Sequence, residues 1–200
     1  MKKLYIIFFA VITFTLMSQS SYAAAREWEL DLAHSNIYFT VDHIQAKIRG
    51  RFNEIAGKIN FDAANLKESR IAFTIKVDSV DTGISKRDKH LLSADFFDSG
   101  KYPQITFESK AITDAGKGVY EVAGILTVKG QAHDVVLPLT FGGIKEHPAV
   151  PGKQVIGFNG NIAFDRLALN VGDGKFYKMG IVGKDVDVLV TFEALSPAAK

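Results

Sequence analysis

The stretch Ile71-Ala72-Phe73-Thr74-Ile75-Lys76-Val77 carries the pattern that decides the fold. Every second residue in it is a large apolar one, and smaller or polar residues lie between them. Because successive side chains of a strand point to opposite faces, this period of two predicts a strand with one apolar face. Such a face must be buried against another element of the protein.

The same alternation returns along the rest of the chain, and turn-forming residues separate most of the segments. A change of phase between Phe52 and Ile55 predicts a bulge near Asn53 and Glu54. Pro138, on the outward phase of its segment, indicates a strand edge or a local break in the hydrogen-bond ladder. The segments are centred on residues 28–30, 37–41, 55–61, 71–77, 105–107, 120–128, 135–141, 156–164 and 186–192.

One segment departs from this rhythm. Ser85-Lys86-Arg87-Asp88 fits a capping box, with Ser85 as the N-cap and Asp88 at the third helical position, and predicts a short helix that continues to Leu92. The fold class is therefore all-β, with about eight antiparallel strands and one short helical insertion. The strands either form a sandwich or close into a lipocalin-like barrel, which removes exposed edges and can hold one small ligand.

The first residues have the plan of a secretory signal peptide. Lys2 and Lys3 precede an uncharged, mostly apolar run from residue 4 to 17, and residues 21–25 are suited to cleavage after Ala23 or Ala25. The apolar run is shorter than the roughly 20 residues that a membrane span needs. We therefore expect residues 1–23 to be removed, and residues 24–200 to form one domain in the periplasm, with the extracellular space as the alternative.

Charge and cysteine content narrow the range of partners. The chain has 24 basic and 22 acidic residues, so removal of Lys2 and Lys3 leaves 22 of each. A neutral mature chain argues against nucleic acid as a partner. Cysteine is absent, so stability must come from burial without disulfides. We expect no stable membrane insertion, and a homodimer remains an open alternative.

Several motifs together resemble a known family. The order 79–82 (SVDT), 87–91 (RDKHL), 93–98 (SADFFD) and 102–107 (YPQITF) is the most specific, and Asp31-Leu32-Ala33-His34-Ser35 is similar to the family's opening pattern. In these motifs, and in 124–130 and 182–186, the chain resembles the YceI-like family of lipid- or polyisoprenoid-binding proteins. The resemblance implies a lipocalin-like barrel with a long apolar tunnel for a polyisoprenoid or quinone-like lipid. One departure concerns the mouth of the pocket, where Leu169-Asn170 replaces the family's Phe-Gly pair.

The inward-facing residues near the middle of the strands are the candidate lining of this tunnel. On the pattern alone, their rings could instead fill a solid core. His43 is in phase with these residues, so it would either bond a lipid head group or be a buried structural histidine. The candidate lining residues are Phe39, Val41, Phe61, Phe73, Ile75, Phe107, Leu126, Leu137, Phe158 and Ile162.

Arg87, Asp88 and His90 lie together on the predicted helix and have two interpretations. They could clamp a lipid head group, with Arg87 pairing a phosphate or carbonyl. Alternatively they brace the fold, with Asp88 capping the helix and Arg87 bridging to the sheet. Asp165 and Arg166 are expected to form a surface or mouth pair.

Catalytic, metal and cofactor motifs are not found in the sequence. It contains no nucleophile elbow and no Walker loop, and its five histidines lack zinc-motif spacing. The family resemblance, together with the predicted signal peptide, implies a periplasmic carrier of a long-chain apolar lipid, and we expect no enzyme activity, cofactor or metal. Two alternatives remain: a lipid-modifying enzyme that uses His43 as its base, and a chaperone-like interaction barrel without a cavity.

Overall fold

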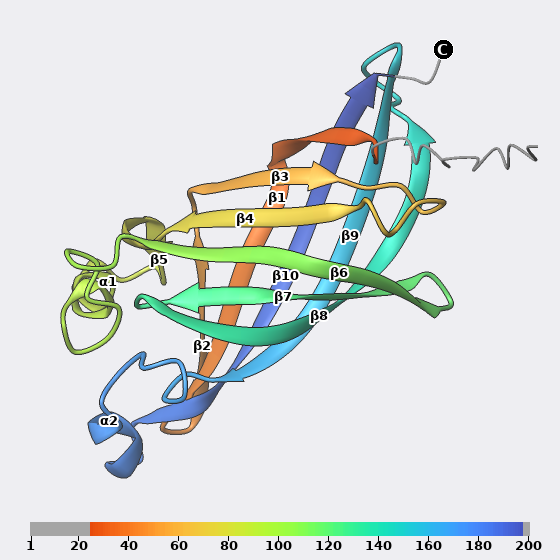
Figure 1. Cartoon of the computed structure of the whole chain (residues 1–200). Coiled ribbons are helices and arrows are strands. Elements are labelled where there is room, and N and C mark those ends of the chain that lie inside the picture. The colour runs from red at the N-terminus through yellow and green to blue at the C-terminus, as the bar shows by residue number, and fades with distance from the viewer. Residues whose placement is uncertain (1–24, 198–200) are drawn as a thin grey trace, which may run out of the picture.

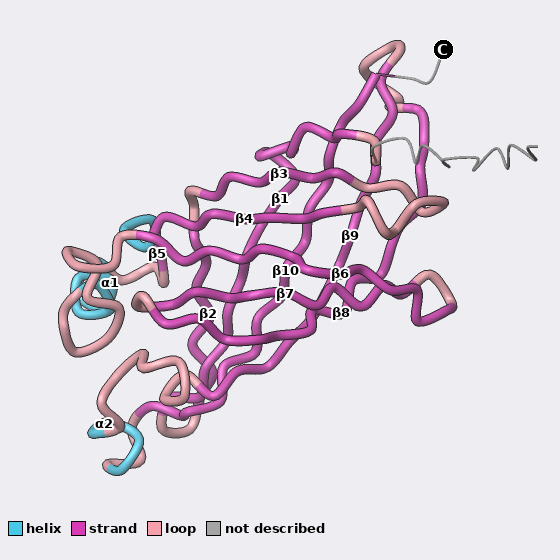
Figure 2. Tube along the Cα trace, in the orientation of Figure 1, coloured by secondary structure: helices cyan, strands magenta, loops and turns pink. Residues whose placement is uncertain are grey.

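The computed structural model describes residues 25–197, so the predicted signal peptide, residues 1–23, lies outside the described residues. Most of the described chain is antiparallel strand, with two short helices and one 3₁₀ turn (Figures 1 and 2). The strands are β1 (Glu27–His43), β2 (Ala46–Phe52), β3 (Ile55–Asn60), β4 (Arg70–Lys76), β5 (Val80–Asp81), β6 (Gln104–Gly116), β7 (Val119–Val128), β8 (Gln131–Glu146), β9 (Lys153–Asp165) and β10 (Val182–Pro197); the 3₁₀ turn is Val77–Ser79 and the helices are α1 (Ser85–Leu92) and α2 (Lys175–Lys178).

Eight strands close into a barrel, as predicted. Their order is β10-β9-β8-β7-β6-β4-β3-β1, and β1 pairs again with β10 to complete the ring (Figure 1). On its other side, β1 pairs with β3 through a short ladder, with Glu27 opposite Asn60 and Trp28 opposite Ile59. The remaining length of β1 pairs with β2, and β2 with the short β5. The all-β, lipocalin-like barrel fold is thus confirmed.

The change of phase after Phe52, where the sequence predicts a bulge, is a break between two strands. β2 ends at Phe52 and β3 begins at Ile55. Between them, Asn53 N donates to Ser79 O at 3.0 Å, and Glu54 O accepts from Lys76 N at 3.0 Å. Because of this break, the chain from β2 to β3 forms two separate ladders with β1. β2 pairs with one part of β1, and β3 pairs with another.

Pro138 marks a local break in the wall, one of its two predicted roles. Pro138 lies opposite Glu121 in the β7–β8 ladder, but the β8–β9 ladder begins only at Thr140, opposite Asn159. Proline has no N–H to donate, so it is tolerated where one side of the strand has no ladder partner. From Gln131 to Leu139, β8 therefore follows β7 while β9 diverges towards α2 (Figure 1).

The helix α1 begins differently from the prediction. Its N-cap is Ile84, and no side chain caps it, so the predicted role of Ser85 as N-cap is wrong. The Asp88 carboxylate instead reaches back over the helix start, where its Oδ1 accepts from Thr82 N at 2.9 Å and from Thr82 Oγ1 at 2.5 Å. The second helix, α2, was not predicted, because four residues are too few to show a helical period.

Aromatic rings fill the end of the barrel away from the two helices. Phe61 contacts Tyr120, Phe141 and Phe158, with ring centroids 5.3, 5.2 and 5.0 Å apart. Phe158 also stacks on Phe192, with centroids 5.0 Å apart. Tilted, edge-on and offset contacts of this kind are favourable between aromatic rings. This end of the barrel is thus a packed core, and we call these five rings the aromatic plug.

Candidate functional site

Three adjoining pockets occupy the other half of the barrel. We call them the innermost, middle and outer pockets. The innermost and middle pockets share Ile75 and Leu126. The middle and outer pockets share Phe39, Val41 and Leu91. Because they share lining residues, the three pockets adjoin one another, and this row of pockets, called the passage below, begins at the end of the barrel carrying α1 and α2 (Figure 1). The innermost pocket is lined entirely by apolar residues, so the passage suits a hydrocarbon chain more than a polar metabolite.

Most of the predicted tunnel residues line this passage. Phe61 and Phe158 do not, because both belong to the aromatic plug and are almost fully buried. The period of two predicts which side chains point inwards, but it cannot tell how far along the barrel axis each one lies. The predicted residues found in the pocket walls are Phe39, Val41, His43, Phe73, Ile75, Phe107, Leu126, Leu137 and Ile162.

A glycine positions one of the main lining rings. Phe39 on β1 lies opposite Gly50 on β2, and a Cβ at Gly50 would clash with the Phe39 ring. The ring can therefore lie over the bare backbone of β2. It contacts Phe52 with centroids 5.7 Å apart, and Phe52 contacts Phe97 at 5.9 Å. This series of rings connects the barrel wall to the segment that follows α1.

The outer pocket contains the polar groups of the site. Its lining includes His43, Thr82, Arg87 and His90 together with the apolar Phe176. Arg87 Nε donates to Thr82 Oγ1 at 2.7 Å, and its terminal nitrogen donates to Thr82 O at 2.7 Å. With the Asp88 bonds to the same threonine, these contacts are those of a brace between α1 and the end of β5. The brace leaves Arg87 at the wall of the pocket, where it can also meet a ligand.

His90 connects the helix to its neighbours. Its Nε2 lies 2.9 Å from Asp95 Oδ2. Its ring is edge-on to Phe96, with centroids 5.1 Å apart, and to Phe176, at 5.6 Å. Phe96 and Phe176 stack on each other at 5.8 Å, which links the α1 segment to α2 across the mouth. His90 is therefore part of the contact between the α1 segment and α2.

Arg166 belongs to the lining of the middle pocket, and the sequence analysis placed it wrongly. It is buried instead of forming a surface or mouth pair with Asp165, whose carboxylate bonds Lys184 Nζ at 3.0 Å. The guanidinium donates to the backbone carbonyls of Gly183, Val171 and Val182, at 2.7, 2.8 and 3.2 Å. Burial lowers the pKa of this guanidinium, and the carbonyl contacts replace the water that it loses. Nothing in the local sequence distinguishes such an arginine from an exposed one.

The departure from the family pattern at Leu169-Asn170 does lie at the mouth. Leu169 lines the middle pocket. Asn170 adopts φ 58°, and its Nδ2 donates to Gln131 Oε1 at 2.6 Å. Asparagine tolerates this left-handed conformation better than most residues. The pair therefore supplies one apolar wall and one bridge from the loop before α2 to the β7–β8 turn.

His133 is the one described side chain with a buried polar atom that lacks a hydrogen-bond partner. That atom is Nε2. The side chain is on the inward phase of β8 with Val135 and Leu137, and it lies opposite Leu126. An unpartnered buried donor or acceptor costs free energy, so this position is not optimised for stability. The alternation of β8 could have identified His133 as inward-facing, but the sequence analysis did not single it out.

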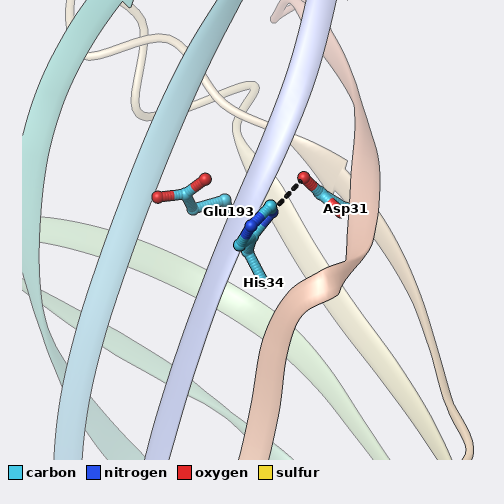
Figure 3. Close-up of side chains that lie close together, drawn as sticks. All are labelled: Asp31, His34 and Glu193. Carbon is cyan, nitrogen blue, oxygen red and sulfur yellow. Dashed lines mark hydrogen bonds and ion pairs between the residues drawn. The ribbon is translucent and has the colours of Figure 1, made fainter.

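A second polar cluster lies outside the barrel, on β1 and β10 (Figure 3). His34 Nδ1 and Asp31 Oδ2 are 2.7 Å apart, and Glu193 lies beside them. The hydrogen bond raises the pKa of His34 and lowers that of Asp31. Possible ligand atoms of the three side chains lie within 4.8 Å of one another. The Asp31–His34 ion pair, at a shift in the β1 register, accounts for the arrangement without a metal.

His43 lies at the polar end of the site without a carboxylate partner among the described residues. A general base usually needs a partner that fixes its orientation and tautomer. The arrangement has an apolar interior and a polar rim, which is the combination that suits an amphiphile.

The comparisons with known proteins agree with this geometry. A UPF0312 protein of Vibrio cholerae is 38% identical over 141 residues, which cover 69% of this chain and 74% of the relative. A UPF0312 protein of Pseudomonas syringae is 32% identical over 184 residues, 90% of this chain and 92% of the relative. The crystal structure of Burkholderia cenocepacia BcnA matches with a TM-score of 0.72 at 31% identity, over 84% of this chain and 99% of BcnA.

A more distant solved structure carries a name that states its ligand class. A polyisoprenoid binding domain from Saccharophagus degradans has a TM-score of 0.63 at 16% identity, over 85% of this chain and 98% of that domain, and so shows the shared fold. Barrel and passage together define a lipocalin-like binding protein. The YceI-like domain model matches residues 28–194, and the chain belongs to that family. In the part of the chain that the structure describes, no helix has the length and apolar character to span a bilayer.

Proposed function

We propose that the mature chain is a periplasmic carrier that holds a long-chain isoprenoid lipid in the barrel. The observation that supports it is the row of adjoining pockets, whose innermost member is lined by apolar side chains alone. The name of the Saccharophagus degradans domain supports a polyisoprenoid as the ligand class. A branched isoprenoid chain suits this lining because it offers methyl groups and forms no hydrogen bonds.

The energetics of such a ligand are favourable. Each buried CH₂ contributes roughly 0.8 kcal/mol, so one five-carbon isoprene unit contributes about 4 kcal/mol before the cost of ordering the chain. A few buried units are therefore enough for tight binding. Units beyond the depth of the passage stay in water and add nothing. The aromatic plug should set that limit, because it closes the inner end.

The experiment is a titration of prenyl alcohols of increasing length against wild type and Val41→Phe. Val41 lies at the wall shared by the outer and middle pockets, so a larger ring there should obstruct the passage while keeping it apolar. We expect wild-type affinity to rise with chain length and then level off. We expect Val41→Phe to lose about 2–4 kcal/mol of binding free energy for long chains, the share of roughly one isoprene unit.

The result that overturns the proposal is an affinity independent of chain length, or equal binding by the blocked variant. Ile144→Phe is the matched control, because Ile144 is exposed on β8. The lipid extracted from protein purified without detergent would identify the natural ligand by mass spectrometry. Intact mass from the periplasmic fraction tests export, with a mature chain expected to begin at Ala24 or Arg26.

A lipid-modifying enzyme is the second candidate. It would need His43 as the base, and the only supporting observation is that His43 lines the outer pocket. Loss of a lipid turnover in His43→Ala, with lipid binding retained, would favour the enzyme over the carrier. The interaction barrel without a cavity receives no support from the passage described above.

A further inference from the structure

The end of the barrel where the passage opens has exposed apolar side chains at its rim. Eight large apolar residues of the described chain are strongly exposed, and four of them lie in the segments of this end. Exposed apolar groups that gather at one place usually mark a contact surface. The four are Ile44 (64% exposed), Met179 (59%), Ile84 (53%) and Tyr177 (45%).

These residues surround the mouth of the passage. Ile44 is in the β1–β2 turn and donates its N–H to Ile181 O at 3.0 Å, so the turn lies against the segment after α2. Tyr177 and Met179 belong to α2 and its end, and Ile84 is the N-cap of α1. The outer pocket is lined from both sides, by α1 residues and by Phe176 and Ile181. Both helices lie at the same end of the barrel in Figure 1.

Ile44 is held in an unusual conformation. Its φ is 52°, in the left-handed region that a β-branched residue rarely adopts. Glycine or asparagine would be easier to accommodate in this turn. A strained, exposed isoleucine contributes little to folding, and strain of this kind tends to persist at functional positions. An apolar side chain at the turn tip is therefore better explained by what it contacts outside the protein.

The same end of the barrel is basic. The connections there, residues 44–45, 82–103, 129–130 and 166–181, contain eight lysines and arginines against four aspartates. The predicted mature chain is neutral as a whole, so the charge is unevenly distributed. Lys175 and Lys178 flank the exposed side chains of α2. Apolar side chains with lysines around them are the combination that binds the surface of an anionic bilayer.

We propose that this rim docks on the surface of an anionic membrane, with Ile44, Tyr177 and Met179 entering the interface and Lys175 and Lys178 contacting lipid phosphates. The inference rests on the proposed lipid-carrier function and adds how the ligand is exchanged. In the docked orientation, the mouth between α1 and α2 faces the bilayer. A prenyl chain then passes between membrane and barrel without crossing water, which removes the cost of exposing its apolar surface.

The test is binding of the mature protein to vesicles, measured by flotation. Vesicles of phosphatidylethanolamine with phosphatidylglycerol supply the anionic surface, and phosphatidylcholine vesicles supply a neutral one. We expect binding to the anionic vesicles, weakened by salt because screening shortens the range of the attraction. The Lys175→Gln, Lys178→Gln double variant should bind about tenfold more weakly, which corresponds to roughly 1.4 kcal/mol.

Ile44→Gly with Met179→Ser tests the apolar part, and its expected loss is also about tenfold. Glycine relieves the positive φ at position 44, so this variant is expected to remain folded. Matched controls at positions outside the rim are Ile144→Gly, which removes another exposed isoleucine (49% against 64% for Ile44), and the Lys117→Gln, Lys145→Gln double variant. Both controls should bind vesicles like wild type.

Prenyl alcohol delivered from cyclodextrin, without vesicles, separates docking from carrying. The rim variants should keep wild-type affinity in that assay and should lose only the vesicle-dependent transfer. Absence of wild-type binding to anionic vesicles, equal binding to both vesicle types, or equal losses for rim and control variants would each overturn the docking proposal while leaving the carrier function intact. Absence of prenyl binding by wild type in cyclodextrin would instead reject the carrier function, and docking with it.

Discussion

The two ends of this barrel are built from the same alternating strands but differ in what occupies the interior. At one end, the aromatic plug of Phe61, Tyr120, Phe141, Phe158 and Phe192 leaves no passage. At the other end the barrel contains adjoining pockets, and α1 and α2 lie over its opening. The comparison teaches that one sequence pattern can produce a solid core and a binding site in one sheet. Stability should depend mainly on the plug, and affinity on the open end.

The largest effect should come from removing a ring of the plug. Phe158→Ala deletes a side chain that is 1% exposed and contacts three other rings of the plug. A large cavity in a packed aromatic core should lower the free energy of unfolding by about 3–5 kcal/mol. Chemical denaturation measures this loss. Prenyl affinity of the folded variant should stay near the wild-type value, and a parallel loss of affinity would contradict the division between the two ends.

The brace at the open end should have a smaller effect on stability. Asp88→Ala removes the carboxylate that accepts two hydrogen bonds from Thr82. We expect the free energy of unfolding to fall by about 0.5–2 kcal/mol, as for loss of a helix-terminal hydrogen bond. Prenyl affinity of the folded protein should barely change. A large loss of affinity at an unchanged melting temperature would instead assign these residues to a head-group clamp.

His133 offers a test of opposite sign. Replacing it with leucine removes the buried Nε2 that has no partner in the described structure. We expect His133→Leu to raise the free energy of unfolding of the lipid-free protein by up to about 1 kcal/mol, because an apolar group has no hydrogen bond to lose. Thermal melts of wild type and variant give the comparison, with His147→Leu as the control. Destabilisation would mean that this nitrogen is satisfied in solution.

The smallest effect should be the pH dependence of the Asp31–His34 pair on the outer surface. The hydrogen bond between them raises the pKa of His34 from 6.5 and lowers that of Asp31 from 3.8. Because the pKa of His34 is raised, its ion pair stabilises the folded state fully below the pKa of His34 in the unfolded chain. This stabilisation is lost as the pH rises through the pKa of His34 in the folded protein. Because the pKa of Asp31 is lowered, its ion pair stabilises the folded state fully above the pKa of Asp31 in the unfolded chain. This stabilisation is lost as the pH falls through the pKa of Asp31 in the folded protein.

The two contributions overlap between about pH 4 and 6.5. His34→Ala should therefore differ most from wild type in melting temperature within that window, and the difference should shrink above neutrality. The His34 side chain is 64% exposed, although that of Asp31 is only 15% exposed, so the shift should also weaken in high salt. A difference that is constant from pH 4 to 8 would show that His34 acts through packing instead of charge.

Several details could be predicted because they depend on local chain chemistry. The interruption after Phe52 followed from a change of phase, and the break at Pro138 from a missing N–H. Nine of the eleven candidate tunnel residues line the passage because alternation fixes which side chains face inwards. The remaining two, Phe61 and Phe158, belong to the plug, since depth along the axis depends on how strands are staggered around the closed ring.

The sequence by itself determined the all-β class, the approximate strand count and the inward face of each strand, because these follow from side-chain period and turn chemistry between neighbouring residues. Only the tertiary structure decided that Arg166 is buried against three carbonyls, that α2 joins α1 at the mouth, and that Ile44 lies beside them. These features join segments far apart in the chain. Their geometry is fixed by closure of the barrel, which no local pattern records.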